Sequence, residues 1–198
     1  MGRLSDWADG SGRFRIHTRS ITTSTYPYDA SHVLSVGRLT DTRHAPSYGF
    51  TGRHHPAGPL HELEIILLLH TPDLTIEEAE VRIRTVPRPD CESLDRSLDG
   101  AVGLTIGPGF TEKAKGLAGR GTGCTHLAHL LTVMAPAILQ GWWALSDREL
   151  PEPGEARRRA GSATRFLRDT CYTWRAGGDA LRELAEIAGM DEASAGVP

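Results

Sequence analysis

The chain has 198 residues, a net charge of −3, and 39% hydrophobic and 24% charged residues, a composition typical of a globular domain that buries a core without disulfide bonds. A nucleic-acid partner is not expected, because binding one calls for a basic face. No apolar run approaches the ~20 residues of a membrane span, and the N-terminus lacks the apolar stretch of a signal peptide. Three widely spaced cysteines do not form a disulfide framework, which favours the cytoplasm, where thiols stay reduced.

The N-terminal half of the chain has the patterns of β-strands. After a polar, glycine-rich segment at 1–12 that we expect to be flexible, Arg13–Thr25 alternates in part, and Val33–Thr42 is a second candidate strand. Leu60–His70 is the most apolar segment and is expected to lie centrally in a sheet. Glu78–Val86 alternates cleanly between apolar and charged residues, so we predict that it pairs with Leu60–His70 as a hairpin with one solvated face.

The segment between the second and third strands, His44–Pro59, is expected to be a loop. It contains three prolines and three glycines, which interrupt regular structure. It also carries His44, His54 and His55, to which the pattern assigns no role.

The C-terminal half has helical periodicity. Short helices are predicted over Cys91–Leu98 and Pro108–Leu117, and a long one over Thr125–Leu145, with two more over Glu155–Arg175 and Asp179–Ala188. The long helix has an apolar stripe and is expected to kink at a proline. The stripe and the proline are Leu127, Leu130, Leu131, Met134, Ile138, Leu145 and Pro136.

Strands followed by helices predict an α+β fold, with an antiparallel sheet of about four strands packed by the C-terminal helices. We expect one domain over residues 13–190, with strands over 13–87 and helices over 91–188, and a flexible tail over 191–198. An open sheet edge can pair with a second copy, so a homodimer is an open expectation.

Two cysteines stand where a helix is predicted to begin. Cys91 follows a stiff, proline-containing linker, and Cys124 follows a glycine-rich segment and opens the longest helix. The positive end of a helix dipole lowers the pKa of a thiol there and favours the thiolate, which binds metals and attacks electrophiles. The alternative for each cysteine is a small buried hydrophobic residue.

Histidines lie close to these positions. His126 and His129 are three residues apart and share a helix face, whereas Cys124 and His126 diverge by roughly 200° if both are helical. His61 lies at the start of the most apolar strand. The spacings match no standard zinc motif, since neither CxxC nor HExxH is present. A solvated helix face, or a polar residue at a strand end, would also explain these histidines.

Several short segments resemble those of a bacterial family catalogued as domain of unknown function 2889. The resemblance spans about residues 15–175, and GCTHL is its most specific part. This family often has His-Asp-Met where the present chain has His61-Glu62-Leu63. The matching segments are Gly37–Thr42 (GRLTDT), Leu60–Leu63 (LHEL), Gly107–Phe110 (GPGF), Gly123–Leu127 (GCTHL) and Asp169–Tyr172 (DTCY). Membership implies a shared fold unit but no particular reaction.

The layout also resembles that of iron–sulfur scaffold proteins of the IscU/NifU type. Leu60–Val86 looks like their central hairpin, Cys91 like their middle cysteine, and Cys124 like their last cysteine. This resemblance implies an IscU/NifU-like core. His61 or Glu62 stands roughly where the first scaffold cysteine would be. Two cysteines with a histidine suit a single zinc or iron ion better than a cluster, which prefers four thiolates.

The leading hypothesis is therefore a small-molecule enzyme with one zinc or iron ion. His61, Cys91 and Cys124 would bind the metal, and Glu62 or His126 would act as acid or base, in a lyase, hydrolase or cyclase reaction of aromatic or secondary metabolism.

Two other functions stay open. In a metal-free enzyme, Cys124 would act as nucleophile or polar anchor and His126 or His129 as base. An aromatic or polyketide-like substrate would then bind among aromatic residues, which could equally be core: Trp142, Trp143, Tyr172 and Trp174. The other open function is that of a metal or iron–sulfur scaffold protein, which would bind its cargo without catalysing a reaction. Cys171 has no chemical role that its position demands.

Overall fold

The computed structural model describes residues 3–5, 14–118, 121 and 123–191. The chain separates into two compact units, Met1–Gly141 and Trp142–Pro198, each described below by itself. The boundary falls inside the longest helix, whereas the sequence led us to expect one domain over residues 13–190. The ends that we expected to be flexible lie almost entirely outside the described residues.

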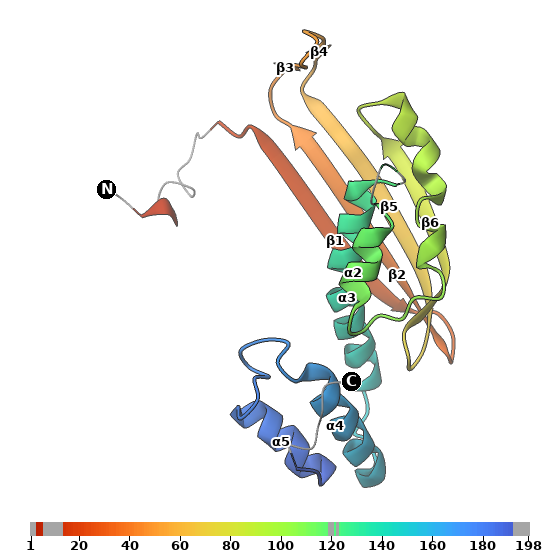
Figure 1. Ribbon diagram of the computed structural model, residues 1–198, viewed down its shortest axis with the longest axis vertical. Coiled ribbons are helices and arrows are strands. Elements are labelled where there is room, and N and C mark those ends of the chain that lie inside the picture. Colours follow the sequence, from red (N-terminus) through yellow and green to blue (C-terminus); the bar gives the residue numbers. More distant parts are fainter. Residues whose placement is uncertain (1–2, 6–13, 119–120, 122, 192–198) are drawn as a thin grey trace. The chain divides into compact units, whose positions relative to one another are not determined.

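The first unit is built on a four-stranded antiparallel sheet with the order β1-β2-β5-β6 (Figure 1). This confirms the α+β class and the hairpin of the third and fourth long strands. A separate two-stranded ribbon, β3 with β4, lies within the segment expected to be a loop. The strands are β1 (His17–Pro27), β2 (His32–Arg43), β3 (Ser47–Tyr48), β4 (His54–His55), β5 (Gly58–His70) and β6 (Thr75–Thr85).

The helices of the first unit lie against one face of this sheet (Figure 1). The short helix expected at Cys91 is a 3₁₀ helix with a proline in its first turn. Glycine at φ 78° precedes α2 and sets its start. The elements are η1 (Pro89–Arg96), η2 (Asp99–Ala101), α2 (Phe110–Gly116) and α3 (Thr125–Ser146).

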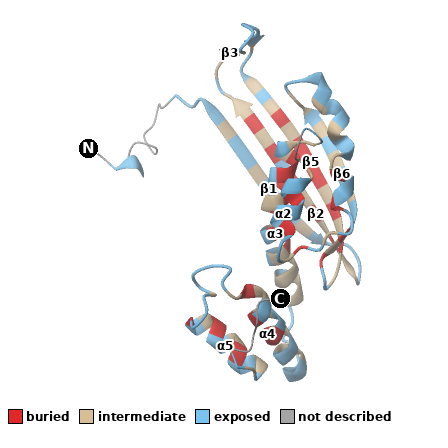
Figure 2. Ribbon diagram, viewed as in Figure 1, coloured by how far each residue is buried: buried red, intermediate tan, exposed pale blue. Residues whose placement is uncertain are grey.

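The core lies between the inner face of the sheet and α3 (Figure 2). Alternate residues of β5 are buried, which is the period of a strand with one face inward. The predicted stripe of α3 is buried from Leu127 to Ile138. Gly37 of β2 permits the close approach of the helix, because a Cβ there would lie 2.3 Å from the Met134 sulfur. This contact fixes where the first turn of α3 lies over the sheet.

Helix α3 also meets the length and hydropathy expected of a membrane span, although no such segment was anticipated from the sequence. Its buried residues, among them Leu130 and Leu131, contribute to the core of the first unit. A core helix has this composition as well, so the hydropathy of α3 does not by itself indicate a membrane.

The second unit contains α4 (Pro153–Leu167) and α5 (Asp179–Ala188), which pack on each other. The helix predicted over Glu155–Arg175 ends early. Asp169 has φ 57°, which no continuing helix allows, and its carboxylate accepts a hydrogen bond from the Ala176 amide. The segment from Arg168 to Gly178 is therefore a loop that contains Cys171.

Candidate active site

Three polar residues form a row across the inner face of the sheet, one on each of three adjacent strands. Arg19 of β1 is directly opposite Asp41 of β2, and Asp41 is directly opposite His61 of β5. The β2–β5 register shifts next to this row, between Asp41 and Thr42. Such bulges redirect side chains and are common next to functional sites. The row thus lies where the apolar core of the sheet ends.

Asp41 is the centre of this row and is 1% exposed. Arg19 donates two hydrogen bonds to it, from Nε to Oδ1 and from Nη2 to Oδ2, each 2.7 Å long. This paired contact is the main reason that the pKa of Asp41 falls to about 2, against the effect of burial. Asp41 is therefore a carboxylate throughout the physiological pH range, and the pKa of Arg19 is raised in turn.

Two histidines of the sheet also contact Asp41. His61 Nδ1 lies 3.0 Å from Oδ2, and His17 Nε2 lies 3.3 Å from Oδ1. His61 is 8% exposed. A carboxylate beside Nδ1 favours a proton on that nitrogen and leaves the Nε2 lone pair for proton transfer, and a metal ion next to Asp41 would take the place of the Nδ1 proton. Asp41 is therefore suited to orient the His61 ring.

His126 reaches the same carboxylate from the helix side. It lies in the first turn of α3, and its Nε2 is 4.0 Å from Asp41 Oδ2. Its ring lies over that of His61, with centroids 4.0 Å apart and planes tilted by 32°. Burial lowers the pKa of His126, and the nearby charges of His61 and Arg19 lower it further. The His126 imidazole is therefore neutral near pH 7.

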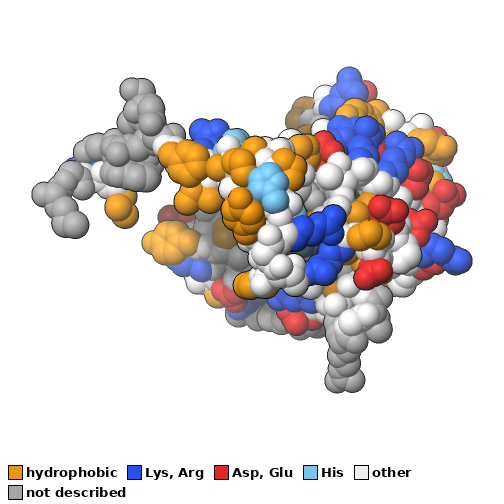
Figure 3. Space-filling model, turned by 90° about the horizontal axis from the view of Figure 1, so that it is seen from above, with side chains coloured by type: hydrophobic (Ala, Val, Ile, Leu, Met, Phe, Trp, Pro, Cys, Tyr) orange, Lys and Arg blue, Asp and Glu red, His pale blue; other side chains and the backbone are white. Residues whose placement is uncertain are grey.

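Asp41, His61 and His126 together form a possible metal site. One ligand atom from each lies within 4.8 Å of those of the other two. His61, which was predicted as a metal ligand, and His126, which was predicted as an acid or base, are thus brought together, and the third group is a carboxylate where cysteines were predicted. The site lies toward the end of the molecule seen from above in Figure 3.

Cys124 lies beside this group. It directly precedes α3, as predicted, and its sulfur is 3.9 Å from His126 Nδ1. Its carbonyl accepts the hydrogen bond of the Ala128 amide, so it caps the helix. Cys124 is half-buried and has no disulfide partner. It can therefore act on His126, or on a ligand held next to it.

The other predicted site residues lie apart from these donors. Cys91 is half-buried in η1, which packs along β6, and it is not among the clustered donors. Glu62 alternates with His61 along β5, so it lies on the opposite face of the sheet, where it accepts a hydrogen bond from Thr85. His129 is exposed on α3, one turn beyond His126.

Sequence reasoning did not single out Asp41 or Arg19. Asp41 stands in the GRLTDT segment, and it occupies an inward position of β2, two residues after the fully buried Leu39. A charged residue at an inward position of a strand is a usable signal, because burying it requires a partner. Arg19 had no comparable signal, since β1 alternates only weakly.

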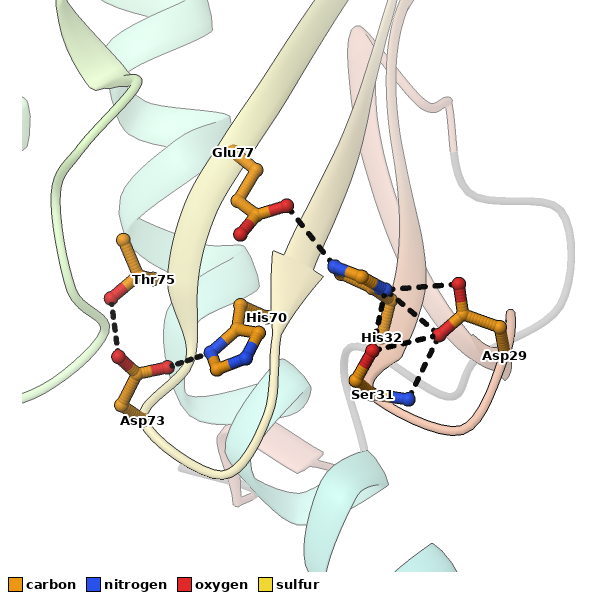
Figure 4. Close-up of polar contacts among 7 residues, drawn as sticks. All are labelled: Asp29, Ser31, His32, His70, Asp73, Thr75 and Glu77. Atoms are coloured by element: carbon orange, nitrogen blue, oxygen red, sulfur yellow. Dashed lines mark hydrogen bonds and ion pairs between the residues drawn. The ribbon is translucent and has the colours of Figure 1, made fainter.

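A second group of histidines and carboxylates lies at the other end of the same strands (Figure 4). His32 Nδ1 is 2.8 Å from Asp29 and its Nε2 is 3.1 Å from Glu77, while His70 Nδ1 is 2.8 Å from Asp73. The two rings meet edge to face at 5.7 Å. Each imidazole here has its own carboxylate, and all five side chains are at least partly exposed.

A comparison with known proteins gives one match. No curated protein and no solved structure is significantly similar to this chain. The IscU/NifU-like core therefore stays a prediction. The family model described as "Protein of unknown function (DUF2889)" matches residues 17–140, which hold the whole sheet, Arg19, Asp41, His61, Cys124 and His126. The chain belongs to the DUF2889 family.

Proposed function

We propose that this protein is an enzyme that acts on a small molecule with the help of one divalent zinc or iron ion held by Asp41, His61 and His126. The observation that supports this most is the convergence of the three donors from β2, β5 and α3. This retains the metal and His61 of the prediction from sequence, makes His126 a ligand, and replaces Cys91 and Cys124 with Asp41 and His126.

The donors have the charge states that a metal needs. Asp41 is ionised and the His126 imidazole is neutral, so a cation would displace at most the proton between His61 and Asp41. Ligands of a zinc ion at ~2.1 Å are ~3 to 3.5 Å apart. The Asp41 oxygen is 3.0 Å from His61 Nδ1 and 4.0 Å from His126 Nε2. A small rotation of His126 would complete the set.

Two histidines and one carboxylate leave coordination positions open, which is the pattern of catalytic zinc and non-haem iron sites. An ion there would polarise a carbonyl group or activate water. Cys124 and His129 are the nearest further groups on α3 that could move a proton. Glu62, which was predicted to serve as acid or base, faces away. The three free thiols fit a cytoplasmic location.

The test is zinc binding by isothermal titration calorimetry to protein stripped with a chelator, together with elemental analysis of the protein as purified. Wild type should bind one zinc ion per chain, and His126→Gln should weaken binding by at least tenfold. His129→Gln is the matched control, three residues along the same helix, and should bind as wild type does. Equal binding by wild type and His126→Gln would refute the proposed ligand set.

A second function is supported by the contact of Cys124 with His126, whose sulfur and Nδ1 atoms lie 3.9 Å apart. Here Cys124 would act as nucleophile without a metal. His126 would accept its proton, and Asp41 would lie on the far side of the His126 ring.

Alkylation by iodoacetamide tests this second function. In a background lacking Cys91 and Cys171, Cys124 should react at least tenfold faster when His126 is present than in His126→Gln. The background is needed because Cys171 is exposed and backbone amides of Trp174 and Thr173 lower its pKa. Equal rates would exclude His126 as the activating base.

A further inference from the structure

We propose that the substrate carries an anionic group, a carboxylate or a phosphate, which binds to the outer edge of Arg19 beside His17. The proposal concerns the same site as the metal and rests on the proposed function only for the reaction that follows binding. Recognition of the anion itself needs only residues of β1 and the fixed position of Asp41.

Arg19 has hydrogen-bonding capacity left over. A guanidinium group has five N–H donors and two edges that can each bind an oxyanion with two parallel bonds. Asp41 occupies the edge formed by Nε and Nη2. The remaining edge, formed by Nη1 and the second hydrogen of Nη2, has no acceptor among the described residues. The Arg19 side chain is 35% exposed, so this edge can meet a ligand from solvent.

Asp41 also prepares Arg19 for such a role. The two bonds to a buried carboxylate fix the plane of the guanidinium, so less side-chain freedom is lost when a ligand binds. His17 lies two residues before Arg19 on the same face of β1, and its ring is within 3.3 Å of Asp41. Its side chain is 44% exposed and lies next to Arg19, so it can contact the same ligand.

Little negative charge opposes an anion at this site. Among the described residues, Asp41 is the one carboxylate within 4.0 Å of Arg19, His17, His61 or His126, and Arg19 already neutralises it. The Cys124 thiol lies next to His126. Glu62, the acidic residue next to His61, lies on the other face of the sheet. Figure 3 shows basic and acidic side chains mixed on the face of the molecule seen from above, with a histidine among hydrophobic groups.

This arrangement would place the reacting part of the substrate near the metal. An acid held by the outer edge of Arg19 would have its adjacent atoms beside the row Arg19–Asp41–His61, whose Asp41 and His61 would hold the ion. We therefore expect substrates in which the reactive carbonyl or hydroxyl group is a few bonds from the anionic group.

The experiment measures binding of two probes, succinate and inorganic phosphate, to the metal-free full chain by isothermal titration calorimetry, with succinamide as the neutral analogue. One of the two anions should bind in the millimolar range or better, and succinamide should not. The better probe shows whether the group is a carboxylate or a phosphate. Arg19→Lys keeps the charge but loses the second edge, and should weaken binding at least tenfold. His17→Gln should weaken it about threefold.

Arg84→Gln, on the opposite edge strand, removes one exposed positive charge and should leave binding unchanged. The proposal is overturned if wild type binds neither anion, or if His17→Gln and a folded Arg19→Lys both bind as wild type does. Should Arg19→Lys fail to fold, unchanged binding by His17→Gln is sufficient to overturn it. Anion binding that depends on Arg19 in a protein that binds no zinc would refute the metal and leave the anion site standing.

Discussion

The two ends of the sheet carry similar residues in different surroundings. At one end, Asp41 is 1% exposed and lies against His61 and His126. At the other, Asp29 and Glu77 flank His32 and have side chains 48% and 46% exposed. Both groups combine imidazoles with carboxylates across strand ends. In the buried group Arg19 and three histidines share one carboxylate, whereas in the exposed group each imidazole has its own.

This difference reverses the effect on the histidines. The hydrogen bond to Asp29 raises the pKa of His32. Burial lowers the pKa of His126, even though Asp41 opposes that shift. The exposed group therefore favours the charged form of its histidine, while the buried group favours a neutral imidazole beside an ionised carboxylate. Only a neutral imidazole, as in the buried group, has a nitrogen lone pair that can bind a metal ion or accept a proton.

The largest expected contrast is in stability. Asp41→Asn leaves the Arg19 guanidinium without its charged partner at a buried position and should lower the free energy of unfolding by ~3 kcal/mol. Asp29→Asn, at the exposed end, removes the same kind of charge and should have a much smaller effect. Urea denaturation of both variants beside wild type measures the difference. Equal losses would show that burial does not distinguish the two ends.

The pH dependence of the free energy of unfolding gives a second test of the buried end. Asp41 has a pKa of about 2 in the folded chain against 3.8 for an unperturbed carboxyl, so its stabilisation is fully present above pH 4. It should be lost as the pH falls through 2, by about 2 kcal/mol in total. The free energy of unfolding of Asp41→Asn should therefore fall less between pH 5 and 2 than that of wild type. Parallel curves would contradict the assignment.

The smallest expected effect is a difference between the pKa values of His32 and His126, which sets the order in which the two side chains titrate. The C–H resonances of His32 should titrate above pH 6.5 and those of His126 below it. Because the folded pKa of His32 is raised, its stabilising effect is present below pH 6.5 and is lost as the pH rises through the folded pKa. NMR titration with His32→Gln and His126→Gln assigns the signals. The reverse order would remove the distinction between the two ends.

The sequence predicted more of the fold than of the site. The four long strands, the hairpin and α3 follow from hydrophobic period, which is clearest in β5 and α3 because each of these two buries one face. Cys124 before α3 and His61 at the start of β5 were also found from local pattern. The pairing of Arg19 with Asp41 and of Asp41 with His61 depends on the register of three strands, which no local pattern specifies.

Two further features followed from backbone conformation. The helix expected up to Arg175 ends at Leu167, because Asp169 takes a left-handed conformation and its side chain bonds to a later amide. The face of Glu62 could be inferred once His61 is known to point inward, since adjacent residues of a strand point to opposite sides. The position of Asp41 between Arg19 and His61 could be learned only from the structure, because it depends on the register of the strands.

The central claim is that the buried end of the sheet, and not the exposed end, holds a metal ion. The most direct test is anomalous X-ray diffraction from crystals of the full chain soaked in zinc, with data collected on both sides of the zinc absorption edge. A peak bounded by Asp41, His61 and His126 is the predicted result. A peak only between His32 and Glu77, or only at Cys91 or Cys124, or no peak at all, would contradict the account.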